Sequence, residues 1–167
     1  NHRIIRQRLE AAGHQFSSDT DSEVLAHLFV EAFDAGMEPA AAAQKVLAEI
    51  DGAYAFAVMS IDHPNMLIVA RNASPLALGI GDKACYVGSD AVALSHLTRK
   101  VVYLKDHDYA LVCAHGVEVY QGDMVPVKRE AVIVAASPGL VDKGGYRHFM
   151  EKEIHEQPDA IARSLAA

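Results

Sequence analysis

The hydrophobic pattern changes its period at Asp51 and Gly52, and this change constrains the fold of the 167-residue chain more than any other feature. Before it, apolar residues recur at helical spacing in three stretches, 2–12, 20–35 and 40–50. After it, short apolar runs are separated by Gly, Pro, Asn and Asp, which is typical of strands and turns. Helices followed by a run of strands predict an α+β domain, with the helices over one face of an antiparallel sheet.

The expected strands are short and follow one another closely. They lie at 53–61, 66–71, 75–80, 84–89, 101–104, 109–114 and 117–120, and a further stretch at 130–136 can form a strand. The first run, AYAFAVMSI, is apolar at nearly every position, so we expect both of its faces to be covered. Residues 90–97 predict one or two helical turns, capped by Ser89 or Asp90. Gly79 and Gly81 are too few glycines for a dinucleotide-binding loop and indicate a hairpin end.

After Gly122 the apolar runs become less regular, and Pro126, Pro138 and Gly139 interrupt them. We therefore expect one folded unit over 1–122, a final strand and linker over 123–145, and a polar helical segment over 146–167 that is a linker or the start of another domain. Proline removes one hydrogen bond from a helix interior, so we expect the last helix to break before Pro158.

The composition excludes several classes of protein. A formal net charge of -7 argues against a nucleic-acid-binding protein. No apolar run is long enough for a membrane-spanning helix and no signal peptide is visible, so we expect a cytoplasmic protein that does not bind membranes. Cys85 and Cys113 are expected to be reduced and buried. The nine histidines show no usual ligand spacing, and we expect neither a metal site nor a cofactor.

The most informative polar stretch is FSSDTDSEVLAHL, residues 16–28, where a turn leads into a helix. Thr20 and Glu23 have the spacing of a capping box. In that register Asp21 lies in the first helical turn, with its carboxylate close to unpaired N–H groups. The residues alone leave two interpretations open. Asp21 only stabilises the helix, or its carboxylate receives a cationic group such as the α-amino group of an amino acid.

No complete catalytic set is visible in the sequence. Glu23 and His27 are four residues apart and can interact on a helix, but His27 can equally be a satisfied, half-buried residue or a base. Neither cysteine has a base at a sequence position that would indicate an activated thiol, and no serine lies in a G-x-S-x-G motif. The catalytic residues of this chain are therefore predicted as none.

Five segments together resemble one family. They are SSDTDSEVLAHL (17–28), GAYAFAVM (52–59), ARNASPLALGIG (70–81), GSDAVAL (88–94) and YRHFMEKEIHEQPDAI (146–161). In this order they resemble the glutamine–fructose-6-phosphate aminotransferases, also called glucosamine-6-phosphate synthases. The last segment resembles the connection between the glutaminase domain and the sugar-isomerase domains of that family.

The resemblance implies the fold and the activity. The family's glutaminase domain is an N-terminal nucleophile hydrolase, an αββα sandwich of two antiparallel sheets between helix layers. This chain resembles its C-terminal part, so we expect an incomplete sandwich that lacks the N-terminal strands. The family moves the amide nitrogen of glutamine to fructose 6-phosphate in amino-sugar synthesis. Glutamine and, in the full-length enzyme, fructose 6-phosphate are the implied substrates, and a homo-oligomer is the implied assembly.

One functional residue carries over from the family pattern. The family uses an N-terminal Cys as nucleophile, a His-Asn-Gly motif as oxyanion hole, and an Arg for the substrate carboxylate. This sequence shows no N-terminal Cys, no His-Asn-Gly and no substrate Arg motif. Asp21 matches the family Asp that receives the α-amino group of glutamine, so we predict Asp21 as a substrate-binding residue. The chain by itself is predicted to be inactive.

Two other functions stay open. The chain can be a non-catalytic, glutamine-sensing or interaction module of the same fold. It can also belong to a purine-pathway glutamine amidotransferase, which shares the glutaminase fold. The segment YRHFMEKEIHEQP argues against the purine pathway, because it resembles the linker of the amino-sugar enzymes.

Overall fold

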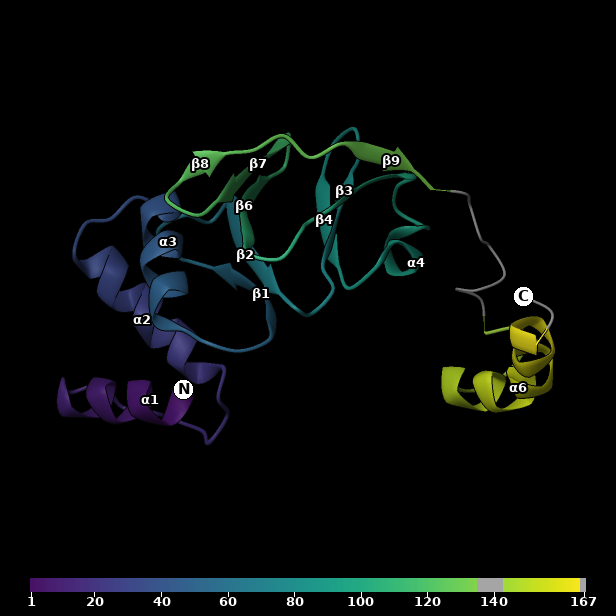
Figure 1. Cartoon of the computed structure of the whole chain (residues 1–167), viewed down its shortest axis with the longest axis horizontal. Coiled ribbons are helices and arrows are strands. Elements are labelled where there is room, and N and C mark those ends of the chain that lie inside the picture. Colours follow the sequence, from purple (N-terminus) through teal and green to yellow (C-terminus); the bar gives the residue numbers. More distant parts are fainter. Residues whose placement is uncertain (135–142, 166–167) are drawn as a thin grey trace.

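A computed structural model describes residues 1–134 and 143–165 of the chain. The chain begins with three helices, α1 (His2–Ala11), α2 (Glu23–Asp34) and α3 (Pro39–Glu49). Figure 1 shows them gathered on one side of the β-structure. The three predicted helices are confirmed, and each ends within a few residues of its expected position. Gly36 adopts φ +75° after α2, where the left-handed backbone favours glycine and ends the helix.

The strands in the described residues form two antiparallel sheets. The first has the order β1-β2-β6-β7-β8, and the second has the order β4-β3-β5-β9. The first sheet consists of β1 (Tyr54–Met59), β2 (Met66–Asn72), β6 (Asp108–Cys113), β7 (Gly116–Gln121) and β8 (Val125–Pro126). The second consists of β3 (Ala77–Ile80), β4 (Cys85–Gly88), β5 (Lys100–Tyr103) and β9 (Ala131–Ile133). The predicted α+β class is confirmed.

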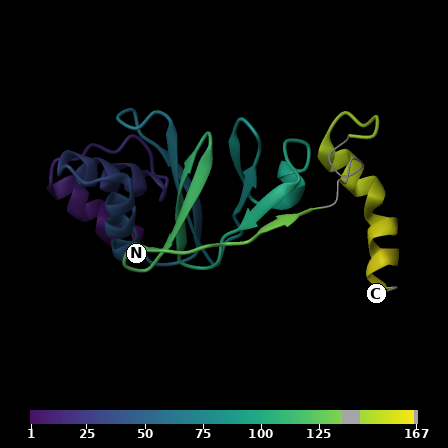
Figure 2. The same ribbon diagram turned by 90° about the horizontal axis from the view of Figure 1, so that it is seen from above.

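The first sheet has one face on the helices and the other on the second sheet, because side chains alternate between the faces of a strand. The residues that pack on the helices are Ile68, Ala70, Tyr109 and Leu111. Those that meet the second sheet are Val69, Ala110, Val112 and Val119, opposite Leu78, Val102 and Leu104. Figure 2 shows the helices, the first sheet and the second sheet side by side.

A short helix, α4 (Ala91–Leu94), lies on the far side of the second sheet. Its Leu94 packs with Ala77 and Val101 in a separate small cluster. The Asp90 carboxylate accepts a hydrogen bond of 2.9 Å from the Ala93 N–H, so the predicted cap is confirmed. The layers are therefore helices, sheet, sheet and a short helix.

The expectation that both faces of the first strand are covered is wrong. In β1, Tyr54, Phe56 and Val58 are half-buried under the helices, while Ala55 and Met59 are exposed. β1 is an edge strand of the first sheet. No described element packs on its second face, and small alanine side chains make an exposed face look apolar without requiring its burial.

The C-terminal region departs from expectation in two places. β8 was not predicted, because it has two residues and one of them is Pro126. The expected break before Pro158 is wrong, since α6 (Phe149–Leu165) runs through that residue. α6 is exposed along most of its length, so the carbonyl that Pro158 leaves unpaired is next to solvent.

The strand expected at 130–136 is confirmed in its first part, since β9 spans Ala131–Ile133 and ends before Val134. Residues 135–142, part of the expected linker 123–145, lie outside the described residues. Figure 1 shows α6 beyond β9, away from both sheets. No helix in the described ranges combines the length and the hydropathy needed to cross a membrane.

Candidate functional site

Asp21 lies in a turn immediately before α2. The helix begins at Glu23 with Ser22 as its N-cap, so the prediction that Asp21 is in the first helical turn is wrong. The backbone carbonyl of Asp21 accepts a long hydrogen bond of 3.4 Å from the Val24 N–H. Its side chain is exposed, and within residues 1–134 and 143–165 its carboxylate has no hydrogen bond or ion pair. This carboxylate is free to receive a cation.

Glu23 fixes the turn that carries Asp21. Its carboxylate accepts hydrogen bonds from the N–H groups of Ser17 (2.6 Å) and Ser18 (2.8 Å), and from their hydroxyls at 2.9 and 2.5 Å. The Ser17 N–H and the Ser18 hydroxyl are the main reasons why the pKa of Glu23 falls to about 2. The predicted capping box between Thr20 and Glu23 is wrong, because four donors of the two serines converge on this carboxylate instead.

His27 has a structural position behind this turn. Its Nδ1 lies 3.1 Å from Nδ1 of His14, and its ring packs on Phe16 with 4.2 Å between ring centroids. Its Nε2 is 3.8 Å from Oε1 of Glu23, which confirms the predicted contact between these two residues. His27 is half-buried and does not line the cavity beside Asp21. The sequence gives no signal for the pairing with His14.

Asp21 lines a cavity of about 350 Å³ where α1, the turn before α2 and the start of β1 meet. The cavity is lined by Asn1, His2, Ile5, Asp21, Ser22, Val24, Leu25, Ile50, Asp51, Ala53, Tyr54, Ala55, Phe56 and Ser74. The Asn1 side chain donates to the Glu49 carbonyl (2.8 Å) and accepts from the Asp51 N–H (3.1 Å). The cavity thus has two carboxylates, Asp21 and Asp51, and an apolar wall from the helices and β1.

The loop after β2 forms another part of this wall. The Asn72 side chain donates to the Gly52 carbonyl at 2.9 Å. Asp106 accepts from the Ala73 N–H (2.9 Å) and from Arg71 (2.6 Å), and these contacts lower its pKa. They hold Ala73 at φ +57°, a backbone conformation that costs energy in a residue with a Cβ atom. The following residue, Ser74, reaches the cavity, so the ARNAS sequence shapes the site next to Asp21.

Neither cysteine belongs to this site. Cys85 in β4 and Cys113 in β6 are free thiols, as expected, but each is only partly buried. Burial raises the pKa of the Cys85 thiol, which disfavours the nucleophilic thiolate. In the part of the chain that the structure describes, no group of three or more His, Cys, Asp and Glu residues could hold a metal ion.

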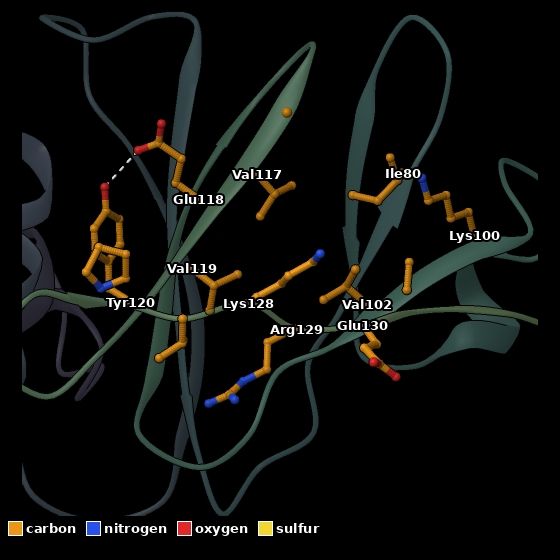
Figure 3. A pocket seen from close by; sticks show the side chains of 14 residues that line it. Ile80, Lys100, Val102, Val117, Glu118, Val119, Tyr120, Lys128, Arg129 and Glu130 are labelled. Atoms are coloured by element: carbon orange, nitrogen blue, oxygen red, sulfur yellow. Dashed lines mark hydrogen bonds between the residues drawn. The ribbon is translucent and has the colours of Figure 1, made fainter.

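An open cleft of about 1120 Å³ lies between the two sheets (Figure 3). Its apolar walls include Val119 of β7 and Val102 of β5, and the Lys128 side chain extends between them. The Arg129 side chain turns away and forms two hydrogen bonds of 2.7 Å with Asp108, which is fully buried. These two residues are 21 positions apart, and no local sequence pattern indicates their pairing.

A family model described as a glutamine amidotransferase domain matches residues 1–96. The chain belongs to this family of glutamine amidotransferase domains. The matched range includes α1 to α4 and β1 to β4. It also includes every residue that lines the Asp21 cavity. The candidate site is therefore part of the amidotransferase domain.

Two relatives of this amidotransferase chain share one name. Glutamine–fructose-6-phosphate aminotransferase [isomerizing] from Zymomonas mobilis is 45% identical over 165 residues, 99% of this chain and 27% of the relative. The protein of that name from Agrobacterium fabrum is 44% identical over 162 residues, 97% of this chain and 27% of the relative. The chain thus spans about a quarter of the length of the curated relatives it matches. The resemblance found in the sequence is confirmed.

Proposed function

We propose that this chain is part of an enzyme that transfers the amide nitrogen of glutamine to fructose 6-phosphate and so makes glucosamine 6-phosphate. The observation that carries the proposal is the Asp21 carboxylate, which lies at a cavity and has no partner among the described residues, in a chain 45% identical to an aminotransferase of that name. The names of the relatives favour amino-sugar synthesis over the purine pathway.

In this proposal Asp21 receives the α-ammonium group of glutamine. A charge-assisted hydrogen bond needs an ionised acceptor in a fixed position. Glu23 supplies the fixed position, because it binds both serines of the turn that carries Asp21. The apolar side chains of Val24 and Phe56 suit the methylene groups of the substrate. A cavity of about 350 Å³ is large enough for a ligand of this size.

The order of the helix and sheet layers supports a more specific assignment of the fold than the α+β class. We propose an N-terminal nucleophile hydrolase sandwich, with residues 1–122 as part of the glutaminase domain, 123–145 as its final strand and linker, and 146–167 as the segment leading to sugar-isomerase domains. Two stacked antiparallel sheets between helices are what this fold requires. The same proposal includes a cytoplasmic homo-oligomer as the complete assembly.

The 167-residue chain alone is expected not to hydrolyse glutamine. Attack on the amide needs an activated nucleophile, and both thiols of the chain lie outside the cavity. Purified chain is incubated with glutamine, and ammonia is measured over time. Steady release of ammonia by the pure chain would refute this part of the proposal.

The role of Asp21 is tested in a chimera that has a nucleophile. Residues 1–167 replace the matching segment of the Zymomonas mobilis relative, and the KM for glutamine is measured. Asp21→Asn is expected to raise KM about tenfold, since a hydrogen bond to a charged group contributes about 1.5–3 kcal/mol and the exposed site favours the lower value. Asp19→Asn is the matched control, because Asp19 is exposed and does not line the cavity.

A second substrate makes this test specific. Glutamine without its α-amino group, 4-carbamoylbutanoate, cannot bind through Asp21 in the proposed way. Asp21→Asn should therefore leave the KM for this analogue unchanged. Equal effects on both substrates would contradict the assigned role. A folded chimera without glutaminase activity would instead favour the alternative function, a glutamine-sensing module.

A further inference from the structure

A second cavity of about 310 Å³ lies between α3 and the turn that joins β7 to β8. Gln44, Leu47, Ala48, Tyr54, His107, Tyr109, Gly122 and Asp123 line it. It shares only Tyr54 with the Asp21 cavity. Nothing in the proposed glutamine chemistry uses its other residues, so the cavity needs an explanation of its own.

The unusual feature of this cavity is the Tyr109 hydroxyl. Tyr109 is 1% exposed, and its hydroxyl is buried without a hydrogen-bond partner in the described residues. The nearby Met124 N–H is already bonded to the Gly122 carbonyl at 2.8 Å. Burial raises the pKa of Tyr109, the adjacent backbone N–H of Met124 offsets part of this rise, and the neighbouring Asp123 charge adds to it. The hydroxyl thus faces the 122–124 turn that forms the cavity wall, and a buried hydroxyl without a partner is unfavourable.

The other polar groups of the cavity mostly accept hydrogen bonds. Gln44 donates its Nε2 to Oδ1 of Asp123 at 3.0 Å. This leaves Oδ2 of Asp123 and Oε1 of Gln44 as acceptors, beside the oxygen of Tyr109. His107, which could supply a positive charge, is exposed. The wall between these groups is apolar and includes the half-buried Tyr54 ring. The cavity is therefore acceptor-rich and carries negative charge.

We propose that this cavity binds a small hydroxylated primary amine in its ammonium form. The ammonium group donates to Asp123 and to Oε1 of Gln44, and a neighbouring hydroxyl of the ligand pairs with the Tyr109 hydroxyl. The volume lies at the lower end of the range of about 300–1,000 Å³ for small-molecule sites, which suits a ligand of this class and not a nucleotide. The proposal does not depend on the role of Asp21.

The test uses serinol, 2-amino-1,3-propanediol, and glycerol, which has the same skeleton with a hydroxyl in place of the ammonium. Each is titrated into the ¹⁵N-labelled 167-residue chain at neutral pH, and backbone chemical shifts are followed. Serinol is expected to bind in the millimolar range and to shift the signals of Gln44, Tyr109 and residues 122–124. Glycerol is expected to bind at least about tenfold more weakly, because it lacks the charged donor.

Three variants locate the ligand. Tyr109→Phe should weaken serinol binding about fivefold, since it removes the hydroxyl that pairs with the ligand. Asp123→Asn should weaken it about tenfold, since it removes the negative charge that faces the ammonium group. Asp123 is exposed, so its variant keeps the test valid if the core variant Tyr109→Phe does not fold. Tyr120→Phe is the matched control. Tyr120 stacks on Tyr109 with 5.4 Å between ring centroids, but its hydroxyl binds Glu118 outside the cavity.

Several results would overturn the proposal. They are the absence of saturable shifts with serinol, equal affinity for serinol and glycerol, and shifts centred on residues 20–24 and 51–56 beside Asp21. Unchanged serinol affinity in Asp123→Asn would also overturn it. So would a crystal structure with serinol in which the Tyr109 hydroxyl binds only an ordered water.

Discussion

Removal of Arg129 should destabilise the fold more than removal of any surface arginine. Arg129 bonds through two nitrogens to Asp108, whose side chain is fully buried while that of Arg129 is 15% exposed. The interaction raises the pKa of Arg129 further above its usual value. In Arg129→Met, the carboxylate of Asp108 keeps only the Lys105 N–H at 2.8 Å among its described partners. A buried carboxylate is then left without its counter-charge.

The size of this effect follows from the burial of the pair. Loss of one partner of a buried ion pair costs about 3–5 kcal/mol, and the partial exposure of Arg129 favours the lower end. We therefore expect a loss of about 3 kcal/mol in the free energy of unfolding, or a fall of about 6–12 °C in Tm for a domain of this size. Urea unfolding at pH 7, followed by circular dichroism, measures the difference.

Two further variants distinguish the effect of breaking the Asp108–Arg129 ion pair from the general effect of losing an arginine. Arg8→Met is the control, because Arg8 is half-exposed and bonds Glu31 and Glu49 at 3.0 Å on the surface. It should cost less than about 1 kcal/mol. The double variant Asp108→Asn/Arg129→Met should lose less than the sum of the two single variants. A cost of Arg129→Met as small as that of Arg8→Met would refute the reasoning.

Two more predictions concern stability. Glu23 has its pKa lowered to about 2, so its contribution to stability is complete above the unfolded-state pKa of about 4.3 and is lost as the pH falls toward 2. The difference in unfolding free energy between the wild type and Glu23→Gln should therefore shrink from pH 5 to pH 2, and a constant difference would contradict this. Gly79→Ala should cost about 1–3 kcal/mol, because its Cβ would lie 2.6 Å from Cγ2 of Thr98, whose hydroxyl is held by the Ile80 carbonyl at 2.6 Å. Gly116→Ala, with no neighbouring atom within 4 Å of the added Cβ, should be close to neutral, and equal melting temperatures of the two variants would show that the close approach at Gly79 is not a constraint.

Local patterns predicted the elements that local interactions determine. The apolar spacing around Val24, Leu28 and Ala32 gives one buried helix face, and all three side chains are buried in α2. The Asp90 cap spans three residues and was visible in the sequence for the same reason. β8 was missed because two residues, one of them proline, carry no alternation. The sequence did not reveal the exposed face of β1, because alanine occurs both at exposed positions and in cores, and its presence does not tell the two apart.

The candidate site was predictable only in part. The capping-box spacing of Thr20 and Glu23 competes with Ser17 and Ser18, and the sequence does not show which partners the carboxylate takes. Two pairs join different parts of the fold: His14 with His27, and Asp108 with Arg129. No sequence spacing predicts such contacts. The assignment of Asp21 to the substrate came from a family resemblance. Its place at a cavity wall supports that prediction without testing it.

The edge position of β1 has a consequence for how the site can be completed. β1 pairs with β2 along one side, and the residues at its start, Ala53 to Ala55, belong to the wall of the Asp21 cavity. A further strand that adds to the other side would bring its own backbone N–H and C=O groups within reach of that cavity. Such an addition would leave the helix–sheet core untouched. Donors from a neighbouring segment can thus join the carboxylate of Asp21 without any rearrangement of the residues that hold it.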